Sequence, residues 1–237
     1  MAALIGGRMS TARCTIFSPF VFRTSKRSWK RRCSLKPDLE KEFLDDHFEG
    51  SDPETLGNIT RCVIVHNDFI TPDEETTLLK EIEAQLKRLR YESSHWDDAI
   101  HGYREVERTN WSPPCDAIIQ RIRTSAFSPD TVQMAHVHCL DLKEDGHIKP
   151  HIDSVRFCGN TIAGLSLLSP SVMRLVHEKH QQRWAKIMLK RRSLYVMIGT
   201  ARYDYTHEIL PNELSTFRCT PVKKTRRISV MCRNEPT

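Results

Sequence analysis

The chain of 237 residues is long enough for one domain with a well-buried core. Its formal net charge of +6 arises in residues 1–36, which hold nine of the 36 Lys and Arg residues and no acidic residue. The remaining 27 basic and 30 acidic residues therefore provide no bulk positive field for general nucleic-acid binding. No run of 18 apolar residues occurs, so a transmembrane helix is not predicted.

Residues 1–36 are basic, contain several Ser and Thr residues and lack acids, which is the composition of a mitochondrial transit peptide. Arginines interrupt its apolar stretches, which argues against a secretory signal. A disordered basic tail is the alternative. We expect this segment to be removed and the mature protein to lie in the mitochondrial matrix. The cysteines show no C-x-x-C spacing, which indicates free thiols in a reducing compartment.

Residues 37–60 are acidic and contain Gly50-Ser51-Asp52-Pro53, so they are predicted to form a flexible linker before a folded domain at 61–237. Cys62–Val65 is the first predicted strand. Thr71-Pro72-Asp73-Glu74 is a helix start with a hydroxyl N-cap, proline at N1 and acids in the first turn, and the helix is predicted to run to about Arg90.

Residues 91–111 are predicted to be irregular, and Ser112-Pro113-Pro114 begins a second helix. From Gln133 onward the pattern changes to short strands separated by turn signals. The predicted strands are Met134–Leu142, Thr161–Leu168, Val172–His177, Leu194–Ile198 and Arg227–Arg233. Ser169-Pro170-Ser171 is predicted to be a hairpin tip. Helices followed by many strands predict an α+β fold, with a double-stranded β-helix (jelly-roll) core backed by N-terminal helices.

His151-Ile152-Asp153 and the distal His207 supply two imidazoles and one carboxylate, which can cap one face of an octahedral Fe(II) and leave the opposite face open. In extended backbone His151 and Asp153 point to the same side. Zinc accepts the same ligands. Arg227 and Arg233 favour iron, because a guanidinium can hold the far carboxylate of a dicarboxylic co-substrate.

Other histidines are weaker candidates for a metal site. His95-Trp96-Asp97 repeats the His-x-Asp motif, but no predicted strand flanks it. His136 and His138 could chelate a metal, although a strand with outward-facing histidines is the simpler interpretation. The basic runs Lys190–Arg192 and Lys223–Arg227 are predicted to be solvated faces, with nucleic-acid contact as the alternative.

Four stretches in order resemble the AlkB-type Fe(II)/2-oxoglutarate dioxygenases. They are His151-Ile-Asp153, Gly164–Leu168, Ala201–His207 and Arg227–Arg233 with its Arg-x5-Arg spacing. Within that family the chain is most similar to the mitochondrial member, over roughly residues 62–233. Ile148–Ser154, Gly164–Leu175, Tyr91–Gly102 and the transit-like N-terminus carry this closer likeness. The resemblance implies a dioxygenase domain that uses Fe(II), 2-oxoglutarate and O2.

The resemblance also implies roles for single residues. His151, Asp153 and His207 would be the catalytic iron ligands. Arg227 would pair with the C5 carboxylate of 2-oxoglutarate, and Tyr195 would donate its hydroxyl to the same co-substrate. Ser229 and Arg233 would line that pocket. Tyr195, Arg227, Ser229 and Arg233 fall on predicted strands, and His207 follows the strand Leu194–Ile198 and a polar turn.

The chain departs from the nucleic-acid-repairing members of the family. Those members carry an Asn-x-Tyr pair on the strand before the His-x-Asp motif, where this chain has Leu140 and Leu142, and Tyr195 is expected to replace the lost hydroxyl. The short segment 92–111 leaves little room for a lid that grips a flipped base, so duplex DNA is not an expected partner. Leu140 is expected to face the predicted pocket, and the sequence leaves open whether it is self-hydroxylated.

We therefore predict a mitochondrial dioxygenase that hydroxylates a protein or another non-DNA substrate. The resemblance links it to programmed necrosis after alkylation damage and to fatty-acid metabolism. One alternative is a demethylase of N-methylated bases in mitochondrial RNA, with Trp96, Tyr103 and Trp111 as stacking platforms. Anchoring of the segment to the core is the simpler role for these aromatic residues. Another alternative is a regulatory protein that senses 2-oxoglutarate or oxygen.

Overall fold

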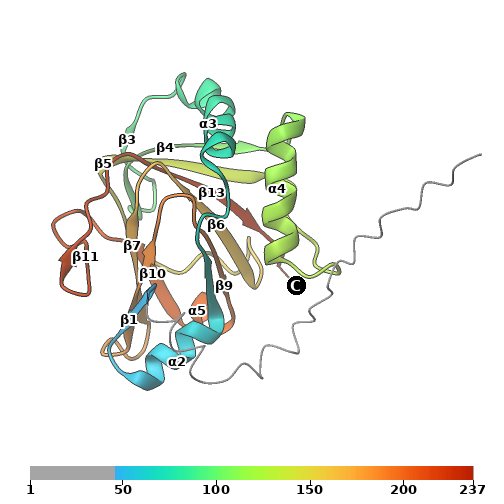
Figure 1. Cartoon of the computed structure of the whole chain (residues 1–237). Coiled ribbons are helices and arrows are strands. Elements are labelled where there is room, and N and C mark those ends of the chain that lie inside the picture. The colour runs from blue at the N-terminus through green and yellow to red at the C-terminus, as the bar shows by residue number, and fades with distance from the viewer. Residues whose placement is uncertain (1–45, 237) are drawn as a thin grey trace, which may run out of the picture. The chain divides into compact units, whose positions relative to one another are not determined.

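The computed structural model describes residues 46–236, where helices are interspersed with strands as far as Ala126 and strands predominate after it (Figure 1). The helices are α2 (Pro53–Cys62), α3 (Pro72–Leu86), α4 (Pro113–Ala126) and the short α5 (Gly199–Tyr203). The strands are β1 (Phe48–Gly50), β2 (Val63–His66), β3 (Glu92–Ser94), β4 (Ile100–Arg108), β5 (Val137–His151), β6 (Thr161–Leu167), β7 (Ser171–His177), β8 (Trp184–Leu189), β9 (Leu194–Ile198), β10 (Tyr205–Ile209), β11 (Thr216–Phe217), β12 (Thr220–Pro221) and β13 (Arg227–Arg233). The predicted transit peptide lies outside the described residues.

Helix α3 begins where the sequence predicts and ends earlier. Thr71 and Glu74 form a reciprocal capping box at its start. The helix was predicted to reach about Arg90 but ends at Leu86, because the Arg104 guanidinium donates to the carbonyls of Leu86 and Leu89. Its buried side consists of Glu75, Leu78, Ile82 and Leu86.

The predicted linker at 37–60 is wrong for its second half, because β1 and α2 lie there. Asp52 accepts the backbone N–H of Thr55, and Pro53 follows at N1, so α2 begins with the same signals as α3. Strand β1 pairs with β8, and Thr55 is almost fully buried. The folded domain therefore begins before residue 61. The linker residues before 46 lie outside the described part of the chain.

The strands form a curled antiparallel sheet in the order β1-β8-β7-β10-β5-β13-β6-β9-β2, with the β3–β4 hairpin attached to β5. Strand β5 is the link between its two halves: its first part pairs with β4 and β13, and its end pairs with β10. The predicted hairpin tip at 169–171 is wrong, because β6 pairs with β9 and β13 while β7 pairs with β8 and β10. The chain there crosses from one half of the sheet to the other.

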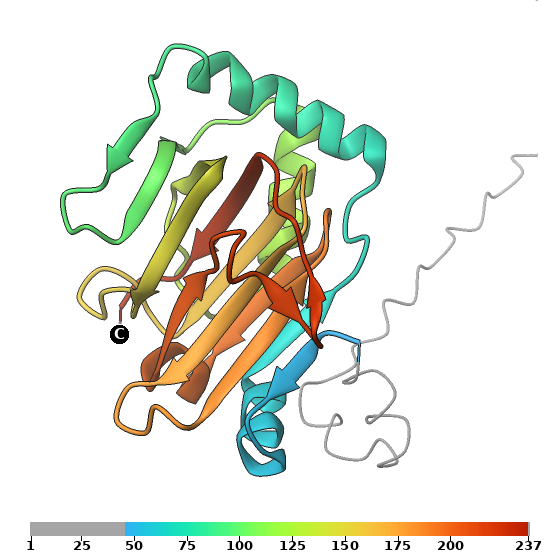
Figure 2. The ribbon, with the colours of Figure 1, turned by 90° about the vertical axis from the view of Figure 1, so that its left-hand side faces the viewer.

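The β3–β4 hairpin corrects the prediction that residues 91–111 are irregular. Strand β4 pairs with β5 along most of its length, and Gly102 relieves the strain of a positive φ where the register shifts. Arg104 and Arg108 point toward α3 and its acidic or carbonyl groups. Figure 2 shows the hairpin, in green, beside the yellow β5.

Two apolar cores explain the arrangement. One lies between the outer sheet face and helices α3 and α4, and includes Leu78, Ile122 and Val230. The other lies between the two halves of the sheet, and includes Leu140 and Met231. Each large aliphatic side chain that is buried in these cores stabilises the fold by about 1.5–3 kcal/mol. The two cores thereby hold the strands in register. The α+β prediction of a jelly roll backed by helices is confirmed. No helix within residues 46–236 is long and apolar enough to cross a bilayer.

Candidate metal centre

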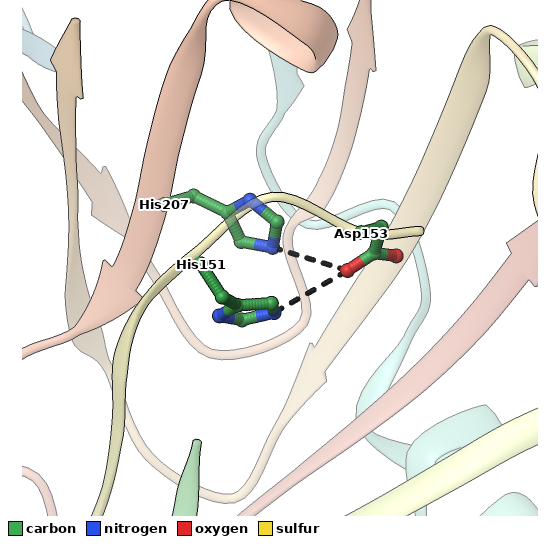
Figure 3. Close-up of side chains that lie close together, drawn as sticks. All are labelled: His151, Asp153 and His207. Carbon is green, nitrogen blue, oxygen red and sulfur yellow. Dashed lines mark ion pairs between the residues drawn. The ribbon is translucent and has the colours of Figure 1, made fainter. Parts of the chain in front are cut away.

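The predicted ligands converge at the end of β5. His151 is the last residue of β5, Asp153 follows in the loop, and His207 lies on β10 as the register partner of His151. The Asp153 Oδ1 atom is 3.3 Å from His151 Nε2 and 3.6 Å from His207 Nε2 (Figure 3). The three ligand atoms lie within 4.8 Å of one another. This is the donor set of a facial triad, with positions left for other ligands.

Hydrogen bonding leaves both imidazoles able to bind a metal through Nε2. The Nδ1 atom of His151 lies 2.9 Å from the carbonyl of Lys149, so Nδ1 carries a hydrogen and Nε2 is the nitrogen that binds a metal once it is deprotonated. The Nδ1 atom of His207 is buried and has no partner among the described residues. Burial, and then the neighbouring His151, lower the pKa of His207 to about 3, so this imidazole is neutral as ligation requires.

Asp153 is ionised despite its burial. Burial alone would raise its pKa, but the hydrogen bond from His151 and the charge of Arg233 hold that pKa well below its ordinary value. Burial alone would lower the pKa of His151, but its hydrogen bonds to Asp153 and to the Lys149 carbonyl raise it. Without a metal, His151 therefore favours its protonated form, in which Nε2 donates to the ionised Asp153, and a bound dication would displace that proton.

Arg233 engages the other oxygen of the carboxylate. Its Nε donates to Asp153 Oδ2 at 2.9 Å, and the side chains of both residues are mostly buried. The spacing on β13 predicted that Arg233 shares a face with Arg227, and the strand does place Arg227, Ser229 and Arg233 on the side opposite the helix-facing Val230. Arg233 is nevertheless paired with Asp153, which distinguishes it from Arg227.

Arg227 is a buried cation with no carboxylate partner among residues 46–236. It is 2% exposed, and it donates to the hydroxyls of Ser229 at 3.1 Å and Ser166 at 3.0 Å. Its Nε has no partner there. Burial lowers the pKa of Arg227 to about 10, so it remains charged at neutral pH. A buried guanidinium that lacks a counter-charge is suited to bind an anion.

Tyr195 lies on β9, and its ring belongs to the inner core that also holds Leu140 and Met231. The charges of Arg227, Asp153 and Arg233 all act on its hydroxyl, and burial raises its pKa, so the phenol stays protonated and can donate. Gly164, its register partner on β6, makes room for the ring: a Cβ there would be 2.4 Å from a ring carbon.

Ser166 was not predicted as a site residue. It lies two residues from Gly164 on β6, so strand alternation puts both residues on one face. Its position beside Ser229 on β13 could be known only from the register between the two strands. Leu140 lies in the same inner core and is the β5 register partner of Ser229, as its predicted position beside the pocket requires.

The other histidine pairs lie elsewhere. His95 and Asp97 hydrogen-bond at 2.7 Å in the turn of the β3–β4 hairpin, so the prediction that no strand flanks this motif is wrong. His138 was expected to face outward and does not. Its Nε2 lies 2.6 Å from Glu105 and its Nδ1 lies 3.4 Å from Arg233. The alternation that turns Leu140 inward also turns His138 inward.

Most of the basic clusters are already paired with acids or carbonyls. Arg191 and Arg192 bind Glu75 and Asp68. Lys223 pairs with Glu144, and the buried Lys224 donates to backbone carbonyls. Arg226 binds Asp141 and Glu83. These cations are therefore engaged in holding elements together, which leaves little free charge for phosphate groups.

Comparison with known proteins agrees with this geometry. The profile of the 2OG-Fe(II) oxygenase superfamily matches residues 58–233. The chain therefore belongs to the 2OG-Fe(II) oxygenase superfamily, whose members use Fe(II), 2-oxoglutarate and O2. The triad supplies donors suited to Fe(II), and Arg227 supplies a charge suited to a dicarboxylate.

Two relatives define its branch of that superfamily. The chain is 52% identical to the mouse (Mus musculus) alpha-ketoglutarate-dependent dioxygenase alkB homolog 7, mitochondrial, and 49% identical to the same protein of cattle (Bos taurus). In both cases the match covers 79% of this chain and 85% of the relative. The chain is thus an Fe(II)/2-oxoglutarate-dependent dioxygenase of the alkB homolog 7 type.

The fold is shared more widely. A prolyl-4-hydroxylase of Pseudomonas putida superposes with a TM-score of 0.51 at 12% identity, over 85% of this chain and 100% of that one. At this identity the likeness concerns the fold alone.

Proposed function

We propose that His151, Asp153 and His207 bind the catalytic Fe(II), and that Arg227 binds the C5 carboxylate of 2-oxoglutarate. The observation that carries the proposal is the buried Arg227, which has no counter-charge within residues 46–236 and lies on the same inner face as the triad. Such a residue destabilises a protein unless an anion joins it. The hydroxyls of Tyr195 and Ser229 supply further hydrogen-bonding groups beside it.

When bound, Fe(II) supplies the oxygen chemistry that couples decarboxylation of 2-oxoglutarate to oxidation of a C–H bond. The chain orients the reactants. His151 is fixed by the Lys149 carbonyl, and Asp153 is fixed by Arg233. The apolar inner core around Leu140 limits the access of water. Arg227 and Tyr195 would fix the far end of the co-substrate and so set the position of its keto acid end.

The iron assignment is tested by metal binding. Asp153→Ala is expected to abolish Co(II) binding by residues 37–237 and to stop succinate production, because only the two imidazoles remain. Arg233→Met is a matched change outside the triad, and it should weaken metal binding without abolishing it. Wild-type turnover of 2-oxoglutarate by Asp153→Ala would contradict the assignment.

The substrate that we propose is a mitochondrial protein or another non-DNA molecule. Support comes from the mildly acidic chain after residue 36 and from the basic clusters at 190–192 and 223–227, whose side chains are largely paired within residues 46–236 and so offer a weak phosphate-binding surface. A polyanion would gain little counterion release on such a surface. The names of both relatives include "mitochondrial", which supports the proposal of matrix import through residues 1–36.

One observation favours mitochondrial RNA as a second candidate. Trp96 is 89% exposed at the turn of the β3–β4 hairpin, and Asp97 beside it lies close enough for its charge to act on His151. An exposed indole near the reactive metal could stack on an unpaired base. By contrast, Tyr103 is 2% exposed and belongs to the inner core, so it cannot serve as an open platform.

Succinate production separates these substrates. Residues 37–237 would be assayed with Fe(II), 2-oxoglutarate and ascorbate, with and without mitochondrial RNA or protein extract. We expect stimulation by the protein extract and none by RNA. Stimulation by RNA that is lost in Trp96→Ala, together with salt-dependent tRNA binding, would favour the second candidate.

The proposed cellular roles, programmed necrosis after alkylation damage and fatty-acid metabolism, rest on the family resemblance. They are tested by returning Asp153→Ala to cells that lack the protein. Failure of Asp153→Ala to restore either function would tie both roles to the metal site. Full rescue by Asp153→Ala would indicate a role independent of turnover. Wild-type protein expressed without residues 1–36 should remain outside mitochondria.

A further inference from the structure

A line of polar contacts runs outward from Asp153 to the β3–β4 hairpin. Arg233 Nε donates to Asp153 Oδ2 at 2.9 Å, and Arg233 Nη1 lies 3.4 Å from His138 Nδ1. His138 Nε2 lies 2.6 Å from Glu105 Oε2. The line thus joins the metal site to β13, β5 and β4, and its inner members are largely shielded from solvent.

The chemistry of the side chains fixes the direction of each hydrogen bond. A guanidinium has only donors, so His138 Nδ1 must accept from Arg233. The hydrogen of this imidazole therefore lies on Nε2 and is donated to Glu105. The hydrogen bond from His138, which outweighs the opposing burial, lowers the pKa of Glu105, so its carboxylate is ionised and accepts. Every contact has one donor and one acceptor, as expected for a built network.

The contact with Arg233 distinguishes the two oxygens of Asp153. Oδ2 is held by Arg233, while Oδ1 faces the Nε2 atoms of His151 and His207. A carboxylate whose second oxygen is engaged in this way binds a metal through one oxygen. If Arg233 moved, the carboxylate could turn and offer both oxygens, which would occupy a position that the co-substrate or oxygen needs.

Arg233 has few other partners to hold it. Apart from Asp153 and His138, its side chain contacts within the described part of the chain only the weak acceptor Met231 Sδ, at 3.8 Å. We propose that His138 and Glu105 are positioning residues for the dioxygenase reaction, which hold Arg233 on Asp153 Oδ2 and thereby keep Oδ1 as the single metal-facing oxygen. This inference rests on the iron site proposed above.

The chain contains a matched control for this pair. His136 and Glu107 lie two residues away on the same two segments, with His136 Nε2 at 3.6 Å from Glu107 Oε1. Both are more exposed than His138 and Glu105, and Arg233 contacts His138 rather than His136. Changes at the control pair remove the same chemical groups from β4 and from the residue just before β5, without reaching the metal site.

The test measures Co(II) affinity and the visible ligand-field absorption of the Co(II)-loaded residues 37–237. We expect His138→Leu to weaken Co(II) binding about tenfold, at the low end of outer-shell effects, and to change the spectrum. His138→Asn, whose amide oxygen can accept from Arg233, should restore most of the affinity. His136→Leu and Glu107→Ala should behave as wild type.

A double variant tests whether Glu105 acts through His138. Glu105→Ala should weaken binding in the same direction, and Glu105→Ala combined with His138→Leu should bind no worse than His138→Leu alone. If His138→Leu does not fold, Glu105→Ala and His138→Asn carry the test. Wild-type affinity and an unchanged spectrum in Glu105→Ala and His138→Leu would overturn the proposal, provided that Asp153→Ala abolishes binding. Retained binding in Asp153→Ala would instead overturn the iron site itself.

Discussion

Replacing Arg227 by Met should have opposite effects on stability and on co-substrate binding. Burial lowers the pKa of Arg227 from 12.5 to about 10. At about 1.4 kcal/mol per pKa unit, this difference corresponds to roughly 3 kcal/mol of destabilisation of the folded protein. Arginine is charged in both states at pH 7, so the penalty is fully present there and would be relieved only as the pH rises above 10.

The substitution also removes two hydrogen bonds, to Ser166 and Ser229, worth about 1 kcal/mol each. Removal of the desolvation penalty therefore outweighs the lost bonds by a small margin. The ligand-free Arg227→Met protein should be as stable as wild type, or about 1 kcal/mol more stable, in urea unfolding at pH 7. Its affinity for 2-oxoglutarate should fall on the order of 100-fold, because a buried charge pair is worth about 3 kcal/mol.

Calorimetric titration of 2-oxoglutarate with Co(II) in place of iron, without oxygen, measures the second effect. Arg226→Met is the matched control, since Arg226 pairs with the buried Asp141 and with Glu83. It should lower the free energy of unfolding by about 1–3 kcal/mol and leave 2-oxoglutarate binding unchanged. A strongly destabilised Arg227→Met protein that still binds 2-oxoglutarate normally would refute the reasoning.

Three further changes probe other features. Gly164→Ala would bring a Cβ to 2.7 Å from the Tyr195 hydroxyl oxygen, so the ring must move, and titration should show about tenfold weaker 2-oxoglutarate binding with unchanged Co(II) binding. Burial lowers the pKa of Lys224 from 10.5 to about 8, so unfolding takes up a proton between these pH values and stability rises with pH there. Across that pH range, the free energy of unfolding of Lys224→Met, measured in urea, should rise about 3 kcal/mol less than that of wild type. An equal rise in the two proteins would contradict this prediction. Arg202 is fully buried and donates to the carbonyls of Cys158 and Gly159. Arg202→Met should therefore lower the free energy of unfolding in urea by about 3 kcal/mol. A loss below about 1 kcal/mol would show that water replaces the guanidinium at these carbonyls.

The helix starts and most of the inner strands could be predicted from the sequence, because local signals determine them. Thr71-Pro72 fixes the start of α3 through its own side-chain and backbone chemistry. Asp52-Pro53 carries the same signal, but the acidic composition around it led to a linker prediction. The end of α3 depends on Arg104, which lies on a different element, so no local pattern indicates it.

The β3–β4 hairpin was missed because its polar residues do not alternate with apolar ones. Its strand character comes from pairing with β5, and that pairing is a tertiary interaction. The triad residues follow from motif order, and their mutual distances needed the register of β5 and β10. The partners of Arg227 and Arg233 could not be predicted, because they depend on which strands lie beside β13.

The position of β13 has a consequence for how the protein folds. Arg227 reaches Ser166 across 61 positions of sequence, and Arg233 reaches Asp153 across 80. Contacts of such long range form late and slowly, because the intervening chain must first be ordered. A newly made chain should therefore acquire a complete iron and co-acid site only after β13 has paired on both sides. Reactive iron would then be held mainly by molecules that have finished folding.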